Sequence, residues 1–315
     1  MLTPEQVADI DRRIKILCES YEAEVMDKIT DFLEFLKTQP TYAAKRQAIR
    51  EFTKYLSKII SSLRSKSNRI VYDTFEEYGQ MSMDDDRQRF EAFKQNLDNA
   101  ELDIGDMRYD GVDWEDMDAA EIRKEYADQV EKTLYTNQKL VNSSMAATTS
   151  KVDQTMRWGI AQITRLGRDP EKVVKDATNK IAEWGVLSTK YDSGYETSVN
   201  SALSSLIRDA VKKATVDASL SVGEQLKSKY YQVTAFNDCA ADHVWLNGEV
   251  FSEKNLDDVY AAMERWGCRH TVYPIYSKEN AVKYDLPSKT QMAENYRQRQ
   301  NANRRSRYAE KHQKH

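Results

Sequence analysis

The first part of the chain carries apolar side chains at every third or fourth position, which places them on one face of an α-helix. Thr3 and Pro4 suit the N-cap and the first helical position, so we expect this helix to run to about Thr38. Pro40 interrupts the pattern, and a second stripe of the same kind covers 48–63. Two long helices joined by a short turn predict a helical hairpin. The first stripe consists of Val7, Ile10, Ile14, Leu17, Tyr21, Val25, Ile29, Phe32 and Leu36.

This stripe is expected to be buried in the core of a helical bundle, and the alternative is that part of it docks on another protein. Helical patterning returns at Ala119 and continues to about Leu166. Asp169 and Pro170 then form a helix start, and Gly185 is a plausible stop. A turn with the sequence TKYDSGYETS leads to a further amphipathic helix. Its stripe consists of Val199, Ala202, Leu203, Leu206, Ile207, Ala210, Val211 and Ala214.

The pattern changes after Tyr230, where apolar and polar residues begin to alternate with the period of two that is typical of strands. Asn247 and Gly248 form a strong turn signal between two such segments. A module of about fifty residues is too small to be stable alone, so it must pack against the helices or be held together by a disulfide or a metal ion. We expect strands over 231–236, 249–251 and 268–276, a helical turn over 238–246 and a short helix over 256–266.

The composition favours long helices, because only 10 Gly and 5 Pro are spread over 315 residues. No run of 18 apolar residues occurs, so no membrane span is expected. The first residues show no secretion signal, and three cysteines favour assembly in the cytoplasm over a secreted disulfide scaffold. We predict a mainly α protein with an elongated helical N-terminal region, a small C-terminal α+β module and a basic helical tail. The expected segments are a hairpin or bundle at 1–97, an acidic linker at 98–121, a helical domain at 122–229, the module at 230–287 and the tail at 288–315.

Charge is unevenly distributed along the chain. Residues 98–121 hold ten Asp and Glu and one basic residue, which is typical of a solvated loop, and the spacing of an EF-hand calcium loop is absent. Residues 289–315 contain eight Lys and Arg and two Glu, a net charge of +6, whereas the rest of the chain has a net charge of −10. An acidic body with a basic tail indicates two different kinds of contact.

Two cysteines and two histidines gather in the C-terminal module. A helical turn would place Cys239 and His243 on one face, and a strand would do the same for Cys268 and His270. The four side chains would form a tetrahedral zinc site if the two elements faced each other. The alternatives are buried cysteines with histidines hydrogen-bonded to the backbone, and a Cys239–Cys268 disulfide.

Catalysis has less support than a structural role. A cysteine with a histidine can act as nucleophile and base, with Asp242 orienting the histidine, but no oxyanion loop is recognisable. A zinc-dependent nuclease or a transferase is a second enzymatic alternative. Neither the phosphate-binding loop of ATPases nor a glycine-rich dinucleotide loop occurs, so the sequence does not support an ATP-driven function or dinucleotide chemistry.

The module contains the pattern C-A-A-D-H-x-x-x-x-G-x-x-F followed by W-G-C-R-H-x-x-x-P. It resembles the C-terminal module of tailed-phage minor capsid proteins, the head-morphogenesis proteins related to the phage Mu F protein. The segment with Tyr191, Gly194, Tyr195 and Arg208 resembles the family's lead-in, and the tail resembles its basic end. The match covers about residues 185–310. Within the module it falls on His243, Gly248, Val250, Phe251, Cys268, Arg269, His270 and Pro274.

The resemblance implies a structural component of the virion, present in few copies inside the capsid at or near the portal vertex. It would act in head assembly and in genome retention or delivery, with the portal protein and the major capsid protein as partners. The chain departs from the family pattern at two points. Many relatives have a C-x-x-C pair where this chain has only Cys239, and C-R-C where it has Cys268, Arg269 and His270.

The basic tail is expected to form a helix over 288–312 with tyrosines among its arginines. Such a helix suits contacts to DNA phosphates without sequence reading. Alternatively, it docks on an acidic protein surface or remains a solvated chain end. The predicted DNA contacts are Arg297, Arg299, Arg304, Arg305, Arg307, Lys311 and Lys314.

Overall fold

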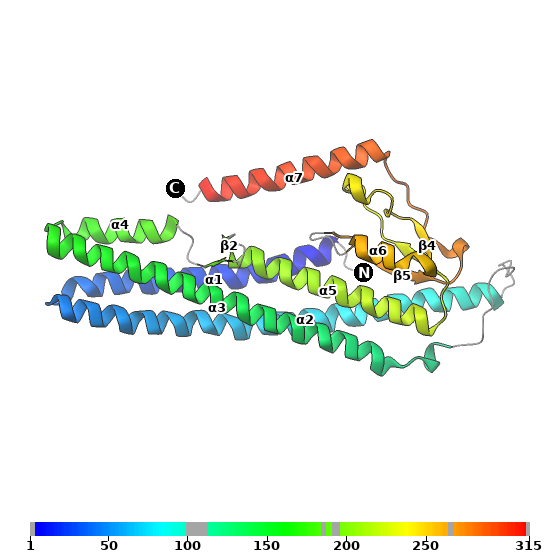
Figure 1. The fold of residues 1–315 in the computed structure, drawn as a ribbon, viewed down its shortest axis with the longest axis horizontal. Helices are drawn as coiled ribbons and strands as arrows, with labels where there is room; N and C mark the ends of the chain where they lie inside the picture. The colour runs from blue at the N-terminus through cyan, green and yellow to red at the C-terminus, as the bar shows by residue number, and fades with distance from the viewer. Residues whose placement is uncertain (1–3, 99–112, 184–186, 191–195, 264–267, 313–315) are drawn as a thin grey trace. The chain divides into compact units, whose positions relative to one another are not determined.

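The computed structural model describes residues 4–98, 113–183, 187–190, 196–263 and 268–312 (Figure 1). It is mainly helical with a small strand region near the C-terminus, which confirms the predicted fold class. The chain forms two compact units, called here the helical unit (2–76 and 128–211) and the C-terminal unit (77–127 and 212–315). Three long helices contribute residues to both units, so these units do not follow the sequential segments predicted above.

The helical unit begins with the predicted hairpin. Helix α1 spans Pro4–Thr38 and α2 spans Tyr42–Asp98, so α1 ends where its pattern predicts and α2 is much longer than its apolar stripe at 48–63. The expected N-cap, Thr3, lies outside the described residues. Most of the α1 stripe is buried, with Ile10, Ile14 and Ile29 fully inaccessible to solvent. The ammonium group of Lys45 donates to the carbonyl oxygen of Leu36 at 2.6 Å and so caps the C-terminal end of α1.

The rest of the helical unit follows the predicted pattern closely. Helix α3 spans Ala119–Leu166, as predicted. Helix α4 spans Pro170–Glu183, and the Asp169 carboxylate accepts from the Glu171 amide at 3.0 Å, which confirms the predicted cap. The predicted turn after it contains a short antiparallel pair, β1 (Ser188–Lys190) with β2 (Glu196–Ser198), before α5 (Val199–Gln225). The expected stop at Gly185 lies outside the described residues.

The C-terminal unit contains a three-stranded antiparallel sheet in the order β4-β3-β5. The predicted strands occur, but β3 and β5 are shorter than expected. A 3-10 turn replaces the expected helical turn over 238–246. No described helix is both long enough and apolar enough to cross a membrane. The elements are β3 (Tyr230–Val233), η2 (Ala241–His243), β4 (Val250–Ser252), α6 (Leu256–Met263), β5 (Val272–Ile275) and α7 (Lys289–His312).

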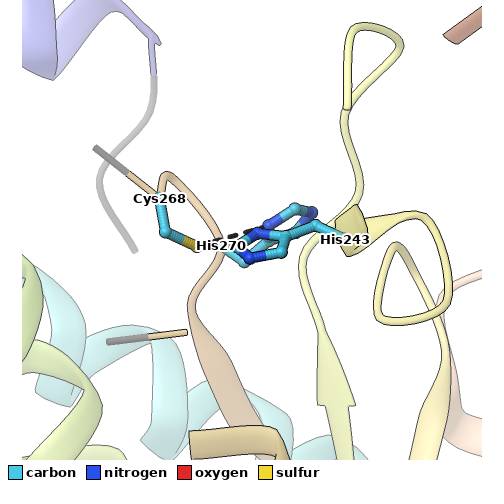
Figure 2. A group of neighbouring side chains, drawn as sticks. All are labelled: His243, Cys268 and His270. Atoms are coloured by element: carbon cyan, nitrogen blue, oxygen red, sulfur yellow. Dashed lines mark hydrogen bonds between the residues drawn. The ribbon is translucent and has the colours of Figure 1, made fainter. Parts of the chain in front are cut away.

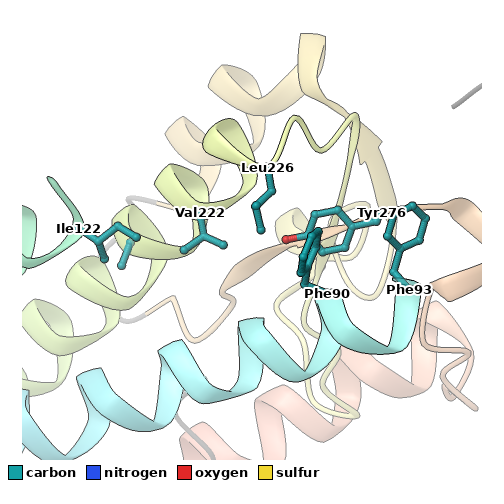
Figure 3. Packing of buried hydrophobic residues seen from close by; sticks show 7 residues of the cluster. Phe90, Phe93, Ile122, Val222, Leu226 and Tyr276 are labelled. Carbon is teal, nitrogen blue, oxygen red and sulfur yellow. The ribbon is translucent and has the colours of Figure 1, made fainter. Parts of the chain in front are cut away.

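Helix α5 contributes side chains to two hydrophobic clusters within the C-terminal unit. Its Val216 packs with Tyr231, Val233 and Val272 of the sheet and with α6. Other positions on the same helix join a second cluster that contains aromatic residues of α2 and reaches the end of β5 (Figure 3). The small sheet is therefore stabilised by packing on a helix. The second cluster consists of Phe90, Phe93, Ile122, Ala218, Val222, Leu226 and Tyr276.

We predict that Ile14→Asp strongly destabilises the helical unit, because it places an unpaired charge at a fully buried position of α1. The expected loss is about 3 kcal/mol or more in the free energy of unfolding, measured by chemical denaturation. The matched control is Ile16→Asp on the same helix, where the side chain is 63% exposed and the expected change is within about 0.5 kcal/mol. Equal stability of the two variants would contradict the assignment of the buried face.

Gly223 of α5 lies at a close approach between that helix and the sheet. A Cβ at this position would lie 2.7 Å from the hydroxyl oxygen of Tyr231 and 3.0 Å from the Cβ of Pro274. Gly223→Ala should therefore destabilise the C-terminal unit by about 1–3 kcal/mol, measured by denaturation. Gly159→Ala on α3 is the control, since its Cβ would meet Val173 at an ordinary 3.5 Å, and a helical alanine should gain about 0.5–1 kcal/mol. If both variants are stabilised, the close approach is wrong.

Candidate functional site

The four predicted metal ligands come from two loops beside the sheet. Cys239 and His243 lie between β3 and β4, and Cys268 and His270 lie just before β5. Neither pair sits on a single regular element as the sequence predicted, because η2 begins after Cys239 and β5 begins only at Val272. The structure nevertheless brings both loops to His270, which is 4% exposed.

Asn247 determines which nitrogen of His270 carries the proton. Its amide group bonds to both backbone groups of Phe236: Oδ1 accepts from the Phe236 amide at 2.8 Å, and Nδ2 donates to the Phe236 carbonyl oxygen at 3.0 Å. The orientation of the amide is thereby fixed. Oδ1 also lies 3.0 Å from Nε2 of His270, and an oxygen can only accept. The histidine therefore donates from Nε2 and keeps a lone pair on Nδ1.

The lone pair on Nδ1 of His270 faces Cys268, whose Sγ is 3.5 Å away. His243 completes a group of three in which the ligand atoms all lie within 4.8 Å of one another (Figure 2). A zinc ion with bonds of about 2.0–2.3 Å to tetrahedral ligands would require only a modest contraction of this group. The residues thus fit a metal ion with two nitrogen donors and one sulfur donor.

Cys239, the fourth predicted ligand, contacts the opposite side of the histidine. Its Sγ lies 3.6 Å from Nε2 of His270, the nitrogen that donates to Asn247. Its thiol also donates to the Ala240 carbonyl oxygen at 3.4 Å. Cys239 and Cys268 are both free, so the alternative disulfide is absent from the structure. Cys239 is therefore not one of the residues whose ligand atoms converge in this group.

Burial sets the protonation of the cluster. It lowers the pKa of His270 to about 3, helped by the nearby His243, and it also lowers the pKa of His243. Both imidazoles are therefore neutral at neutral pH, the form that binds metals. Burial also raises the pKa of the Cys239 thiol to about 11, which keeps it protonated and unreactive as a nucleophile.

Two positions hold the loops in place. The ammonium group of Lys212 on α5 donates to the carbonyl oxygens of Met263 and Cys268, at 3.1 and 2.8 Å. Gly248 adopts φ of +81°, which side chains rarely tolerate, and an added Cβ would meet Tyr284 at 3.1 Å. The sequence indicated the turn at Gly248, but no local pattern marks Lys212 as a support for Cys268.

Arg269, which also belongs to the family motif, links the module to α7. Its guanidinium group forms an ion pair with Asp238 and lies over the ring of Phe236, 4.3 Å from the centroid. Arg299 of α7 forms an ion pair with the same carboxylate, with Nε 2.8 Å from Oδ2 of Asp238. Arg299 was predicted to contact DNA. In the structure its side chain is engaged by Asp238 and supports the module.

The other predicted DNA contacts lie on or after α7, which spans Lys289–His312 as expected. The side chain of Arg297 is 74% exposed and lies 3.6 Å from the carboxylate of Glu294. The structure describes the backbone of Arg304, Arg305, Arg307 and Lys311 within the helix, and Lys314 lies outside the described residues. DNA binding by this set stays a prediction.

The acidic segment 98–121 lies mostly outside the described residues. Where it is described, Asp113 accepts from the ammonium group of Lys94 at 2.8 Å and caps the 3-10 turn η1 (Trp114–Asp116). The bond from Lys94 also lowers the pKa of Asp113. This part of the segment therefore has a structural role.

A buried carboxylate that sequence reasoning missed lies on α2. Asp86 is 1% exposed, and it accepts from Arg89 at 2.5 Å and from the Ser219 hydroxyl at 2.6 Å. Burial raises the pKa of Asp86 despite these partners. Because one carboxylate oxygen accepts from Ser219 of α5 and the other from Arg89 of α2, Asp86 links α2 to α5 and both of its oxygens have partners.

Comparison with family models, with curated proteins and with solved structures finds no match to this chain. The family resemblance therefore depends on the motif residues themselves. In the structure His243 and Cys268 meet at His270, and Arg269 pairs with Asp238.

We predict that the protein binds one zinc ion through His243, Cys268 and His270. Wild-type protein should retain about one zinc per chain in elemental analysis, whereas His243→Ala and Cys268→Ser should retain almost none. Chelation should lower the melting temperature of the wild type and leave these variants unchanged, because the metal stabilises only the folded state.

Cys18→Ala is the matched control, since Cys18 is a buried cysteine of α1 and is not one of the residues that converge in this cluster. It should keep both the zinc content and the response to chelator. Wild-type protein without zinc, with a melting temperature unaffected by chelator, would show that the cluster is held by hydrogen bonds alone.

Proposed function

We propose that this chain is a tailed-phage minor capsid protein, a structural virion component at or near the portal vertex that acts in head assembly and in genome retention or delivery. The observation that carries the proposal is the family-like motif, whose two halves lie on different loops. His243 and Gly248 come from the first half, and Cys268, Arg269 and His270 come from the second. The convergence of His243, Cys268 and His270 gives the motif a physical role, which is to hold the small module together.

The chemistry of the cluster favours a structural role over catalysis. His270 and Cys239 are 4% and 2% exposed, so a substrate has little access to them. Structural zinc sites are closed by protein ligands, whereas catalytic sites keep a position open to water. The neutral thiol of Cys239 also lacks the lowered pKa of a nucleophile.

A virion-associated metal-dependent nuclease or transferase is the second candidate. The observation in its favour is that, among the residues that the structure describes, three protein ligands meet within 4.8 Å, which leaves a fourth coordination position. Nuclease activity that chelator abolishes and a divalent metal restores would favour this candidate. The structural proposal expects no turnover.

The proposed partners are the portal protein, the major capsid protein and packaged DNA. The portal contact is tested by co-expression with a portal protein and by locating the chain in a reconstruction of intact heads without imposed symmetry. Density for the module at the portal vertex alone is the expected result. Its distribution over all vertices, or its absence from heads, would overturn the proposal.

The basic tail provides a separate prediction. Replacing Arg297, Arg304, Arg305 and Arg307 together with Gln should weaken binding to unrelated DNA sequences by similar factors. It should also flatten the dependence of affinity on salt, by about one unit of slope for each lost phosphate contact.

Arg299→Gln serves as the control, because the ion pair of Arg299 with Asp238 makes it a support of the module. Arg299→Gln should lower thermal stability and change the salt dependence little. Equal affinity and equal slope for wild-type protein, the fourfold variant and a tail deletion would show that the tail contributes no DNA contact.

A further inference from the structure

A row of four aromatic rings, exposed at its two ends, crosses the α1–α2 hairpin of the helical unit. Phe32 of α1 stacks on Phe52 of α2, with ring centroids 4.0 Å apart and planes 4° from parallel. The row extends outward through Phe35, 5.9 Å from Phe32, and through Tyr55, 6.3 Å from Phe52. Phe35 and Tyr55 are 49% and 45% exposed. These four residues are called the aromatic face.

The two outer rings lie on the same side of the hairpin. The helices are antiparallel, because Phe32 contacts Phe52 while the earlier Tyr21 bonds to the later Ser62 at 2.8 Å. Phe35 and Tyr55 each follow the stacked pair by three residues along their own helix. In an antiparallel pair of right-handed helices, a side chain three residues further along either helix lies on the same side of the pair. Phe35 and Tyr55 are therefore exposed on one side of the hairpin and are connected through the stacked pair Phe32–Phe52.

Charges of opposite sign border the aromatic face. On α1, Asp27 and Asp31 are exposed one helical turn apart, and Asp31 lies one turn before Phe35. On α2, Lys54 and Lys58 are exposed one turn apart beside Tyr55. Because the helices are antiparallel, Asp31 is level with Lys54 and Asp27 is level with Lys58.

We propose that a second copy of this chain docks on the aromatic face, related by a twofold axis that runs parallel to α1 and α2. Such an axis places α1 of one copy opposite α2 of the other and keeps each residue at its own level along the helices. Asp31 of each copy then faces Lys54 of the other, and Asp27 faces Lys58. The four helices form a bundle that buries the aromatic face of both copies.

The charge pattern favours a second copy of the chain as the partner that binds the aromatic face. One edge is acidic and the other basic, so the face is complementary to itself after this rotation, as an isologous interface requires. Two residues depart from the pattern: Lys28 is half-buried and lies 4.0 Å from Asp31, and Glu51 is exposed on α2. The flanking pairs contribute mainly to orientation, and burial of the rings supplies most of the affinity.

The test is charge reversal followed by mixing, with mass measured by sedimentation. Asp27→Lys with Asp31→Lys should raise the dimer Kd about tenfold or more, because like charges then meet in the homodimer. Lys54→Glu with Lys58→Glu should do the same. Mixing the two double variants should restore a dimer, since each acidic edge again faces a basic one. All four substitutions in one chain should also restore the dimer, which shows that each variant folds.

The apolar contribution is tested with Phe35→Ser and Tyr55→Ser together, which should make the protein monomeric. Tyr135→Ser on α3 is the control, since that ring is 61% exposed on another helix and its loss should leave the dimer unchanged. Wild-type protein that stays monomeric throughout the micromolar range overturns the proposal. The aromatic face would then be a binding surface for a different protein. A dimer that survives both charge reversals also overturns it, because it must then use another surface.

Discussion

The packing of α5 is the constraint on which the C-terminal unit depends. A sheet with strands of three or four residues buries too little apolar surface to be stable alone, so it needs a helix to cover it. The same helix also packs against aromatic residues of α2 through Val222 and Leu226. A helix with two apolar contacts cannot rotate to improve one without losing the other. The absence of a side chain at Gly223 and the buried bond between Ser219 and Asp86 both belong to this compromise.

Much of the helical architecture could be predicted, because its determinants are local. Asp169 with Pro170 specifies the start of α4, and the uninterrupted period of α3 specifies both its ends. Strand ends were predicted less well, since they depend on partners elsewhere in the chain. The alternating pattern from Cys268 onward predicted a strand of nine residues, but β5 pairs only where β3 lies beside it. The pair β1–β2 was missed because its residues resemble a turn.

For the candidate site, the sequence supplied the residue types but not their arrangement. Spacing alone predicted four equivalent ligands. In the structure, the ring of His270 separates Cys268 from Cys239, because each sulfur faces a different nitrogen. That distinction arises from Asn247, which also contacts the backbone of Phe236 from eleven residues away. No periodicity encodes a contact of this kind, since it exists only after both loops have packed beside the sheet.

The dependence on Asn247 also limits which replacements the chain can tolerate there. Aspartate has nearly the same shape as asparagine, differing by one oxygen in place of an amino group. That oxygen would meet the carbonyl oxygen of Phe236, which now accepts a hydrogen bond, and the thioether of Met292 at 3.2 Å. Two acceptors would then face each other in a buried position, with a negative charge added. The module therefore distinguishes asparagine from aspartate by the hydrogen bonds that Nδ2 donates. Spontaneous deamidation of Asn247 would damage the folded protein.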